Sequence, residues 1–313
     1  MRKKVNFEIG KPPSQYSAWF SQILSVASRK KNFKDWLYCH NINFILEDEY
    51  IDLSHIEAGI FFKDIPECVS IKTIPRDIIS ACWGNLLEVI KFAISLNYSI
   101  IIDVDPYYLP CFKKFHKKHG NNSILIYGYD KKRFFFGAFI EYPSNKYRKC
   151  KCLYHEMLKA LQFDFLKDEK PVWYYKINLV YCNEIKLEFS KDILKFNLWK
   201  SLDRINTDCG KDVFEELQKI LVCKGRLDYW TINSLIFYNR LMLARYLYLK
   251  KKKYVKSNSK LEHTIILALI ISYFVKIENA IHLTDKHVKR TSNLLCTLEK
   301  KETEIISAMY NML

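Results

Sequence analysis

Cys39 and His119 are the residues whose chemistry and order first suggest an enzyme. In thiol enzymes of the Cys–His type, a cysteine at a helix N-terminus forms a thiolate, a histidine from a later strand exchanges its proton, and a third polar group orients the imidazole. Cys39 follows Trp36-Leu-Tyr, and His116 and His119 both precede an apolar run that begins at Ser123. We therefore take Cys39 as the candidate nucleophile and His119 as its candidate base.

The same residues also have simpler interpretations. The chain contains 10 cysteines and 8 histidines, so some pair falls in this order by chance. Free cysteine is among the most buried residue types, and in this alternative Cys39 is a core thiol. His40 beside it is expected to be a surface or capping residue rather than a base.

These side chains need elements that position them, and the hydrophobic periodicity predicts an α+β fold. Near the candidate nucleophile we expect a helix that begins around Cys39, with Asp35 as an upstream cap; its apolar face would carry Leu37, Ile42, Ile45 and Leu46. Further helices are expected at residues 83–97 and 154–161. Apolar, β-branched runs predict strands at residues 99–105, 123–128, 133–140 and 172–181, the second and third as an antiparallel hairpin, with residues 185–189 as a partner of the last.

Acidic and aromatic side chains gather where the strand at 99–105 ends. Asp103, Asp105, Tyr107 and Tyr108 stand around Pro106. The carboxylates suit orienting a histidine, binding a substrate amine or holding the Asp-Pro turn, and the tyrosines suit lining a cleft or packing in the core. Asp105, Tyr107 and Tyr108 are accordingly candidate substrate-binding residues.

The character of the sequence changes near residue 191. Strand patterns stop, and helical periods follow at residues 191–205, 210–223, 229–253, 258–281 and 284–312. We therefore expect an α+β domain over residues 1–190 and a helical region over residues 191–313 that packs against it.

The composition is typical of a globular protein of the cytoplasm. Hydrophobic residues make up 49% of the 313 residues, and no apolar run of a secretory signal follows the basic N-terminus. The apolar stretch from Thr264 to Val275 is shorter than the roughly 20 residues needed to span a bilayer, so we expect a buried helix there and no membrane contact. The scattered cysteines indicate reduced thiols, and no spacing indicates a metal, nucleotide or redox cofactor.

The net charge of +16 favours an acidic partner. The basic runs Arg29 to Lys31, Lys113 to Lys118 and Lys250 to Lys253 are separated in the sequence, which is typical of solvated faces. A basic nucleic-acid-binding protein remains an alternative, although no RNA- or DNA-reading motif is present. Clustering of the lysines of the last third on one face would favour it.

Two segments resemble the signature of the butirosin-biosynthesis acyltransferase family. They are Ile102-Asp-Val-Asp-Pro-Tyr-Tyr-Leu-Pro110 and Lys118-His-Gly-Asn-Asn-Ser-Ile-Leu-Ile-Tyr-Gly-Tyr-Asp130. They are similar to that family's strand ending in Asp-x-Tyr-Tyr-Leu-Pro, its His-x-x-His pair and its strand ending in Gly-Tyr-Asp. The resemblance implies a papain-like cysteine-enzyme fold for the first domain, an antiparallel sheet with helices.

The resemblance also implies an activity. Such a protein moves an acyl group from a carrier-protein thioester to an amine in secondary-metabolite, peptide-antibiotic biosynthesis, here through an acyl intermediate on Cys39. Its partners are an acidic acyl or peptidyl carrier protein, which suits a basic surface, and a small amine or acyl substrate. Asp130, which matches the Gly-Tyr-Asp turn, joins Cys39 and His119 as a candidate catalytic residue.

The sequence departs from the family's pattern at two positions. Asn122 stands where the second histidine of the His-x-x-His pair is expected, and Gly137 stands near the place of an acidic residue. An amide does not act as a general base near neutral pH, so we count Asn122 among the substrate-binding candidates. The alternative function is a catalytically degraded relative that serves as an accessory, scaffold or binding protein in the same pathway.

Overall fold

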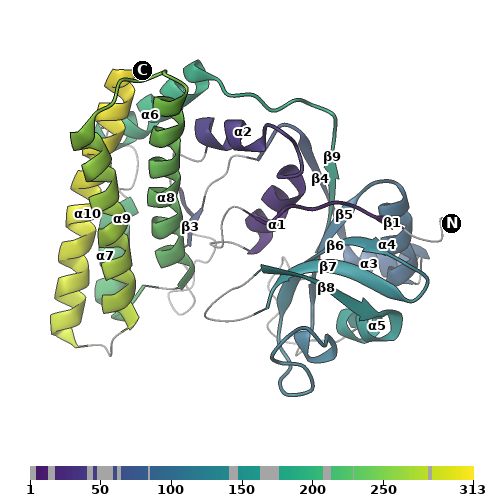
Figure 1. The fold of residues 1–313 in the computed structure, drawn as a ribbon. Coiled ribbons are helices and arrows are strands. Elements are labelled where there is room, and N and C mark those ends of the chain that lie inside the picture. The colour runs from purple at the N-terminus through teal and green to yellow at the C-terminus, as the bar shows by residue number, and fades with distance from the viewer. Residues whose placement is uncertain are drawn as a thin grey trace. The chain divides into compact units, whose positions relative to one another are not determined.

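The chain folds into two compact units. A computed structural model (Figure 1) describes residues 5–12, 18–40, 45–47, 59–61, 65–83, 85–140, 147–162, 176–206, 213–227, 229–280 and 284–313. Unit 1 comprises Met1–Phe33 and Ile65–Leu187, and unit 2 comprises Lys34–Asp64 and Glu188–Leu313. The second segment of unit 2 starts close to the expected boundary, but residues 34–64 cluster with the helices instead of the expected first domain.

Unit 1 is built on a seven-stranded antiparallel sheet. Its main path runs β4–β9–β5–β6–β7–β8, and β1 pairs with β6. The α+β class and the strands expected to start at residues 99, 123 and 133 are confirmed. The strands are β1 (Val5–Asn6), β4 (Val69–Pro75), β5 (Ser99–Val104), β6 (Asn122–Tyr129), β7 (Arg133–Phe139), β8 (Tyr147–Leu153) and β9 (Lys176–Cys182).

Strand β5 lies in the middle of the sheet and leads to the site. It pairs with β9 and β6, and all six of its residues are buried. Its β-branched run Ile100–Ile102 suits a strand that is covered on both faces. Asp103 lies opposite Ser123, and Val104 lies opposite Asn122. The polar residues that follow β5 therefore emerge beside the beginning of β6.

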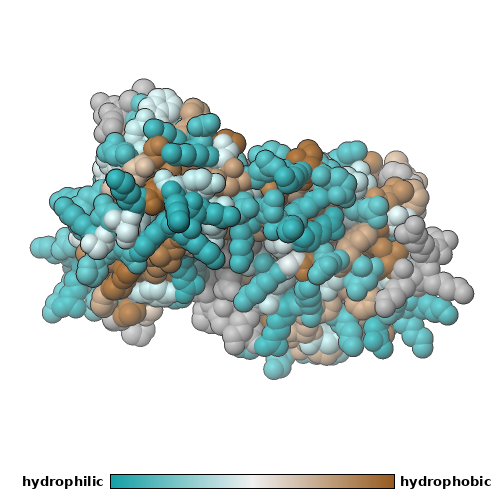
Figure 2. All heavy atoms as spheres, turned by 45° about the horizontal axis from the view of Figure 1, so that its top comes forward, coloured by the Kyte–Doolittle hydropathy of each residue, from teal (hydrophilic) through white to brown (hydrophobic). Residues whose placement is uncertain are grey.

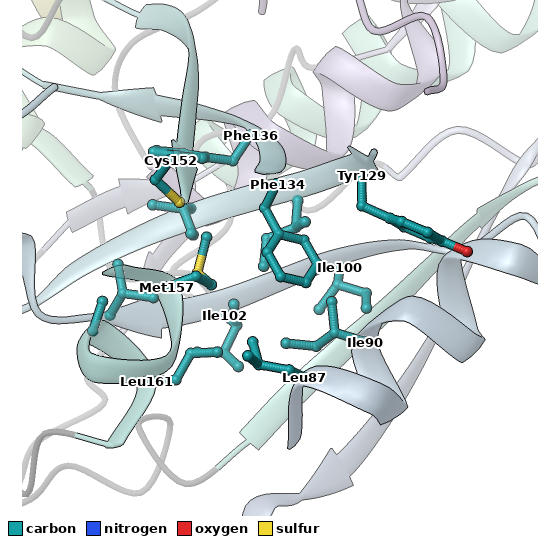
Figure 3. Packing of buried hydrophobic residues seen from close by; sticks show 14 of the residues in the cluster. Leu87, Ile90, Ile100, Ile102, Tyr129, Phe134, Phe136, Cys152, Met157 and Leu161 are labelled. Atoms are coloured by element: carbon teal, nitrogen blue, oxygen red, sulfur yellow. The ribbon is translucent and has the colours of Figure 1, made fainter. Parts of the chain in front are cut away.

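Helices cover both faces of this sheet. On one face, α4 (Leu86–Ser95) and α5 (Tyr154–Gln162) contribute Ile90, Met157 and Leu161 to a core that also contains Ile102 and Phe134 (Figure 3). The other face receives α1 (Ala18–Ala27), which contacts β6, β7 and β9 (Figure 1). The short α3 (Arg76–Trp83) follows β4 directly. Burial of each large apolar side chain contributes roughly 1.5–3 kcal/mol, so this core holds β5 and β6 in place.

Unit 2 is mainly helical, as expected for the C-terminal region. Helix α9 contacts α8 and α10, and α10 also contacts α6 and α7. The five predicted helical segments are confirmed, with ends that shift by a few residues. The elements are α2 (Phe33–Cys39), the hairpin of β2 (Ile45–Glu47) and β3 (Gly59–Phe61), α6 (Lys191–Asn206), α7 (Val213–Lys224), α8 (Tyr229–Lys251), α9 (Ser259–Ala280) and α10 (Asp285–Met312).

Two predicted elements are wrong. Cys39 is the last residue of α2 and does not begin a helix. Of the residues expected on the apolar face of that helix, Ile45 and Leu46 belong to β2, and Ile42 lies outside the described residues. Residues 185–189 are not a strand. Strand β9 instead pairs along its whole length with β4 and partly with β5, so both of its edges are occupied.

Helix α9 carries the apolar stretch from Thr264 to Val275 and is buried on one face only. Residues such as Ile265 and Ala268 are buried, whereas the opposite face exposes Ile266, Leu267, Ile270, Phe274 and Ile277. Figure 2 shows patches of hydrophobic side chains on an otherwise mostly hydrophilic surface. In the described part of the chain, no helix has the length and apolar character that crossing a membrane requires.

Candidate functional site

A carboxylate–imidazole pair in unit 1 offers the clearest chemistry. Oδ2 of Asp105 lies 2.6 Å from Nδ1 of His119. Oδ1 of Asp105 accepts the backbone N–H groups of Tyr107, at 3.0 Å, and of Gly120, at 3.1 Å. The Asp105 side chain is fully buried, whereas 45% of the His119 side chain is exposed. A carboxylate shielded from water thus holds an imidazole that a substrate can reach.

The sequence after β5 explains why these two residues meet. Asp105 caps a short 3₁₀ turn, η1 (Pro106–Tyr108), whose first residue has the fixed φ of proline. The chain then folds back, and the N–H of His116 donates to the carbonyl of Tyr107 at 3.0 Å. His116 has a φ of 53°, in the left-handed region. This reversal returns His119 to Asp105 before β6 begins.

The contact with Asp105 sets the tautomer of His119. An ionised carboxylate can only accept hydrogen bonds, so Nδ1 carries the proton and Nε2 is the basic nitrogen. The ring of Tyr107 stacks on His119 with a centroid distance of 4.0 Å, and Tyr108 lies at 5.8 Å. Three of the four candidate substrate-binding residues, Asp105, Tyr107 and Tyr108, therefore surround the candidate base. This arrangement suits general acid–base chemistry.

Asp130 lies in a turn and does not orient the imidazole. Its Oδ1 accepts the N–H groups of Lys132 and Arg133, each at 2.8 Å, in the turn between β6 and β7. Its carbonyl accepts the hydroxyl of Tyr154. The carboxylate behind His119 is Asp105, for which the sequence left open orienting a histidine, binding a substrate amine or holding the Asp-Pro turn, and the first of these agrees with the observed contact.

Asn122 makes a structural hydrogen bond at the beginning of β6. Its Nδ2 donates to the carbonyl of Phe139 at 3.1 Å. The bond joins the first residue of β6 to the last residue of β7. An amide in this position holds the strand ends together and offers no basic nitrogen.

Asp103 is a second buried acid at this end of the sheet, with 8% of its surface exposed. Burial raises its pKa to about 6, and the nearby Arg76 guanidinium and a hydrogen bond with Ser123 act in the opposite direction. Arg76 also donates to the backbone carbonyl of Asp103. The folded protein therefore holds this proton more tightly than the unfolded chain does.

Because of Asp103, the free energy of unfolding of unit 1 should decrease as the pH rises from 4 to 6. An unfolded aspartate has a pKa of about 3.9, and the folded value is about 6. The stabilising effect of protonation is complete below pH 4 and is lost as the pH rises through 6, a change of about 2–3 kcal/mol. Asp103→Asn removes this dependence. The difference in free energy of unfolding between the variant and the wild type should therefore shift in favour of the variant by that amount between pH 4 and pH 8. Hydrogen exchange of the β5 amides measures the difference, and an equal effect at both pH values would contradict it.

Cys39 belongs to unit 2 and is fully buried at the C-terminal end of α2. Its Sγ accepts the N–H of Ser190 at 3.0 Å and lies 3.5 Å from the carbonyl of Asp35. Nδ2 of Asn197 donates to the Cys39 carbonyl at 2.8 Å. Because the C-terminal end of a helix carries partial negative charge, it disfavours an anionic sulfur. Cys39 therefore does not begin the helix that carries it, although its sulfur faces the N–H of Ser190, the residue directly before α6.

The sequence reading missed α1, the helix that lies on the sheet next to the site. Its buried Gln22 donates from Nε2 to the carbonyl of Ser123 at 2.8 Å, one residue from Asn122. The helix begins at Ala18 and contains no cysteine. The spacing of Phe20, Ile23, Leu24 and Ala27 is helical and could have revealed it.

Comparisons with known proteins give no indication of function. A scan against protein-family models finds no match to the chain, and a search of curated proteins finds none either. Within the ranges given above, no three His, Cys, Asp or Glu side chains lie close enough together to hold a metal ion. The Asp105–His119 pair is therefore the feature on which a functional proposal depends.

Proposed function

We propose that unit 1 catalyses acyl transfer from a thioester to an amine, with His119 as the general base and then the general acid. The observation that carries this proposal is the 2.6 Å contact between a fully buried Asp105 and a half-exposed His119. A carboxylate in this place holds the imidazole in one tautomer and stabilises the imidazolium that forms. Positioned acid–base groups of this kind typically contribute 10²–10⁴-fold to a rate, roughly 3–5 kcal/mol.

The proposed reaction needs no other protein group to balance it. Nε2 of His119 takes a proton from the amine as its nitrogen attacks the thioester carbonyl carbon. The carbon–sulfur bond then breaks, and the imidazolium returns the proton to the leaving thiolate. The products are an amide and a free thiol, and His119 is restored.

Positive charge on the loop that carries His119 supports an acidic acyl donor. Lys113, Lys114, Lys117 and Lys118 are all exposed on this loop. An acidic acyl or peptidyl carrier protein would meet complementary charge beside the imidazole, which speeds encounter and fixes orientation. The resemblance of residues 102–110 and 118–130, which flank this loop, to carrier-dependent acyltransferases favours the same donor.

Direct transfer replaces the cysteine-bound intermediate in this proposal. Cys39 is buried at the negative end of a helix, and α1 begins with Ala18. Neither is the exposed thiol at a helix N-terminus that such an intermediate requires. A papain-like arrangement of the sheet, with α1 as its central helix, is part of the same proposal and does not depend on a thiol.

The test is aminolysis of acyl-pantetheine thioesters with a panel of small amines, followed by release of free thiol. The wild type should accelerate the reaction, and His119→Gln should lower the rate by at least about 100-fold. The matched control is His116→Gln, because His116 stacks on Tyr107 at 5.4 Å but does not contact the carboxylate. Equal losses in the two variants, or no acceleration by the wild type with any amine, would reject the proposal.

A second candidate function is binding without turnover, as expected of a catalytically degraded relative. The hydrogen bond from Asn122 to Phe139 favours it, because the position that would carry a second histidine holds a structural amide. In this case the protein binds an acylated carrier protein, and His119→Gln changes the affinity for it. Neither the wild type nor the variant then accelerates aminolysis.

The reactivity of Cys39 separates these functions from a thiol enzyme. With iodoacetamide at about pH 7, the exposed Cys82 and Cys223 should react first, and Cys39 should stay unmodified in the native protein, since its side chain is buried. Mass spectrometry of the peptides, with a Cys39→Ala control, measures this order. Fast and selective labelling of Cys39 would restore the acyl-cysteine route.

A further inference from the structure

Helix α9 presents an outward stripe of residues with the spacing of a coiled coil. Six exposed residues follow one another at intervals of three, four, three, four and three positions: Lys260, His263, Leu267, Ile270, Phe274 and Ile277. We call these six residues the α9 seam. The opposite face of the helix buries residues such as Ile265 and Ala268. A helix that is apolar on both sides is usually covered on both sides, and a seam of this spacing is covered by another helix.

The two halves of the α9 seam differ in shape. A groove of about 590 Å³ lies along the N-terminal half of α9, and its lining includes His263, Leu267 and Ile270. In the C-terminal half, Phe274 is 51% exposed and Ile277 is 54% exposed. A groove in one half and bulky exposed side chains in the other make the seam complementary to a second copy of itself that runs in the opposite direction.

The charges at the two ends of α9 favour the same antiparallel direction. Lys260 lies at the N-terminal end, whereas Glu278 lies near the C-terminal end, where the backbone also carries partial negative charge. Two antiparallel copies bring these opposite charges together, and two parallel copies would bring like charges together. Between these ends, the seam is apolar from Leu267 to Ile277. An equally apolar surface therefore suits it better than a strongly acidic partner does.

We propose that α9 is the interface of a homodimer, in which two copies of the chain pack their α9 seams antiparallel about a twofold axis. In the register that covers both seams completely, the facing residues of the two copies are Leu267 with Ile270, His263 with Phe274, and Lys260 with Ile277. Each contact occurs twice, because the interface is symmetric. Phe274 of each copy then fills the groove of the other, and the dimer does not depend on the chemistry proposed for unit 1.

The area of the apolar face is sufficient for a dimer of modest affinity. Five large apolar side chains of α9 are between 36% and 54% exposed: Ile266, Leu267, Ile270, Phe274 and Ile277. Together they present on the order of 500 Å² of apolar surface, as large as the largest patch on a typical monomer. Two copies would bury on the order of 1,000 Å², close to the lower limit for a specific interface. We therefore expect a dissociation constant in the micromolar range.

The first experiment is sedimentation equilibrium of the full chain over a range of micromolar concentrations, at about 0.15 M salt to screen repulsion between the basic copies. The wild type should pass from monomer to dimer. Phe274→Glu should raise the dissociation constant at least about 100-fold, because it places a charge against apolar side chains. The matched control is Phe196→Glu in α6, since Phe196 is 57% exposed and the charge changes equally. Circular dichroism confirms that both variants are folded.

A second measurement needs no variant. A carbodiimide joins a lysine amine to a nearby carboxylate, and it should link Lys260 to Glu278 in the dimer. These residues are 18 positions apart in one helix, about 27 Å along its axis, so the link cannot form within one α9.

Three outcomes would overturn the proposal. The first is a wild type that stays monomeric over the whole concentration range, and the second is an equal effect of Phe274→Glu and Phe196→Glu. The third is a monomeric wild type that binds anionic phospholipid vesicles while Phe274→Glu does not, because the α9 seam would then be a membrane contact. A dimer that gives no link between Lys260 and Glu278 would overturn the antiparallel arrangement.

Discussion

Replacing Arg245 by methionine should lower the free energy of unfolding of unit 2 by about 3–5 kcal/mol. Arg245 lies in α8 with no exposed surface. Its Nε donates to the carbonyl of Tyr38 and its Nη2 to the carbonyl of His40, both at 2.7 Å. These carbonyls lie at the end of α2, where the helix has no N–H partners of its own to offer. Methionine fills similar space but leaves both carbonyls buried without this donor, and each such loss costs about 1–3 kcal/mol.

The charge of Arg245 also acts on another buried polar group, Tyr238. The nearby hydroxyl of Tyr238 has its pKa raised, mainly by burial and then by the charge of Glu302, while Arg245 acts in the opposite direction. Glu302 comes from α10 and is itself buried. Removing the cation takes away the positive charge that acts on this buried hydroxyl, so the effect adds to the loss at the end of α2.

The matched control is Arg240→Met in the same helix. Arg240 donates to the hydroxyl of Tyr273 in an exposed contact, and its replacement should cost less than about 1 kcal/mol. Urea unfolding followed by helical circular dichroism compares the two variants, since unit 2 holds the long helices. Similar midpoints for both variants would show that Arg245 does not hold the end of α2.

The residues around Cys39 also show why sequence alone could not place it. The periodicity of the five C-terminal helices and the β-branched run of β5 are local signals, and the structure agrees with both. The end of α2, however, is fixed by Arg245, which is 207 positions away from Tyr38, and by Asn197, which is 158 positions away from Cys39. No local sequence pattern predicts hydrogen bonds between residues so far apart in the chain. A cysteine beside apolar residues therefore looks the same at either end of a helix.

The candidate site divides in a similar way. The turn role of Asp130 is local, since an aspartate that accepts N–H groups two and three residues ahead is a common turn motif, and the sequence pointed to a turn there. The contact of Asp105 with His119 depends on the reversal at His116, whose left-handed φ the sequence does not signal. The pairing of β4 with β9 joins segments separated in sequence by strands β5 to β8, so it was missed.

Asp105→Asn should leave unit 1 folded and lower the rate of the proposed acyl transfer by about 10³–10⁴-fold. The new Oδ1 can still accept the N–H groups of Tyr107 and Gly120. The new Nδ2 is a donor and faces Nδ1 of His119, so the imidazole must present a lone pair there and carry its proton on Nε2. A protonated Nε2 cannot take a proton from the amine, and the neutral amide no longer stabilises an imidazolium.

The tautomer itself can be observed without any substrate. Nitrogen NMR of the imidazole should show the proton on Nδ1 in the wild type and on Nε2 in Asp105→Asn. The cost in stability should be only about 1.5–3 kcal/mol, since one charged hydrogen bond is weakened and two are kept. This combination separates a positioning role from general damage to the loop.

Asp103→Asn is the matched control, because Asp103 lies in β5, two residues before Asp105, and does not contact the imidazole in the contacts described above. It removes a buried carboxylate from the same end of the sheet and should leave both the tautomer and the rate of acyl transfer near those of the wild type. If Asp103→Asn and Asp105→Asn lower the rate equally, burial of charge rather than orientation of His119 controls the site. If Asp105→Asn inverts the tautomer and the rate stays unchanged, His119 is not the base of the reaction, and the proposed mechanism is rejected.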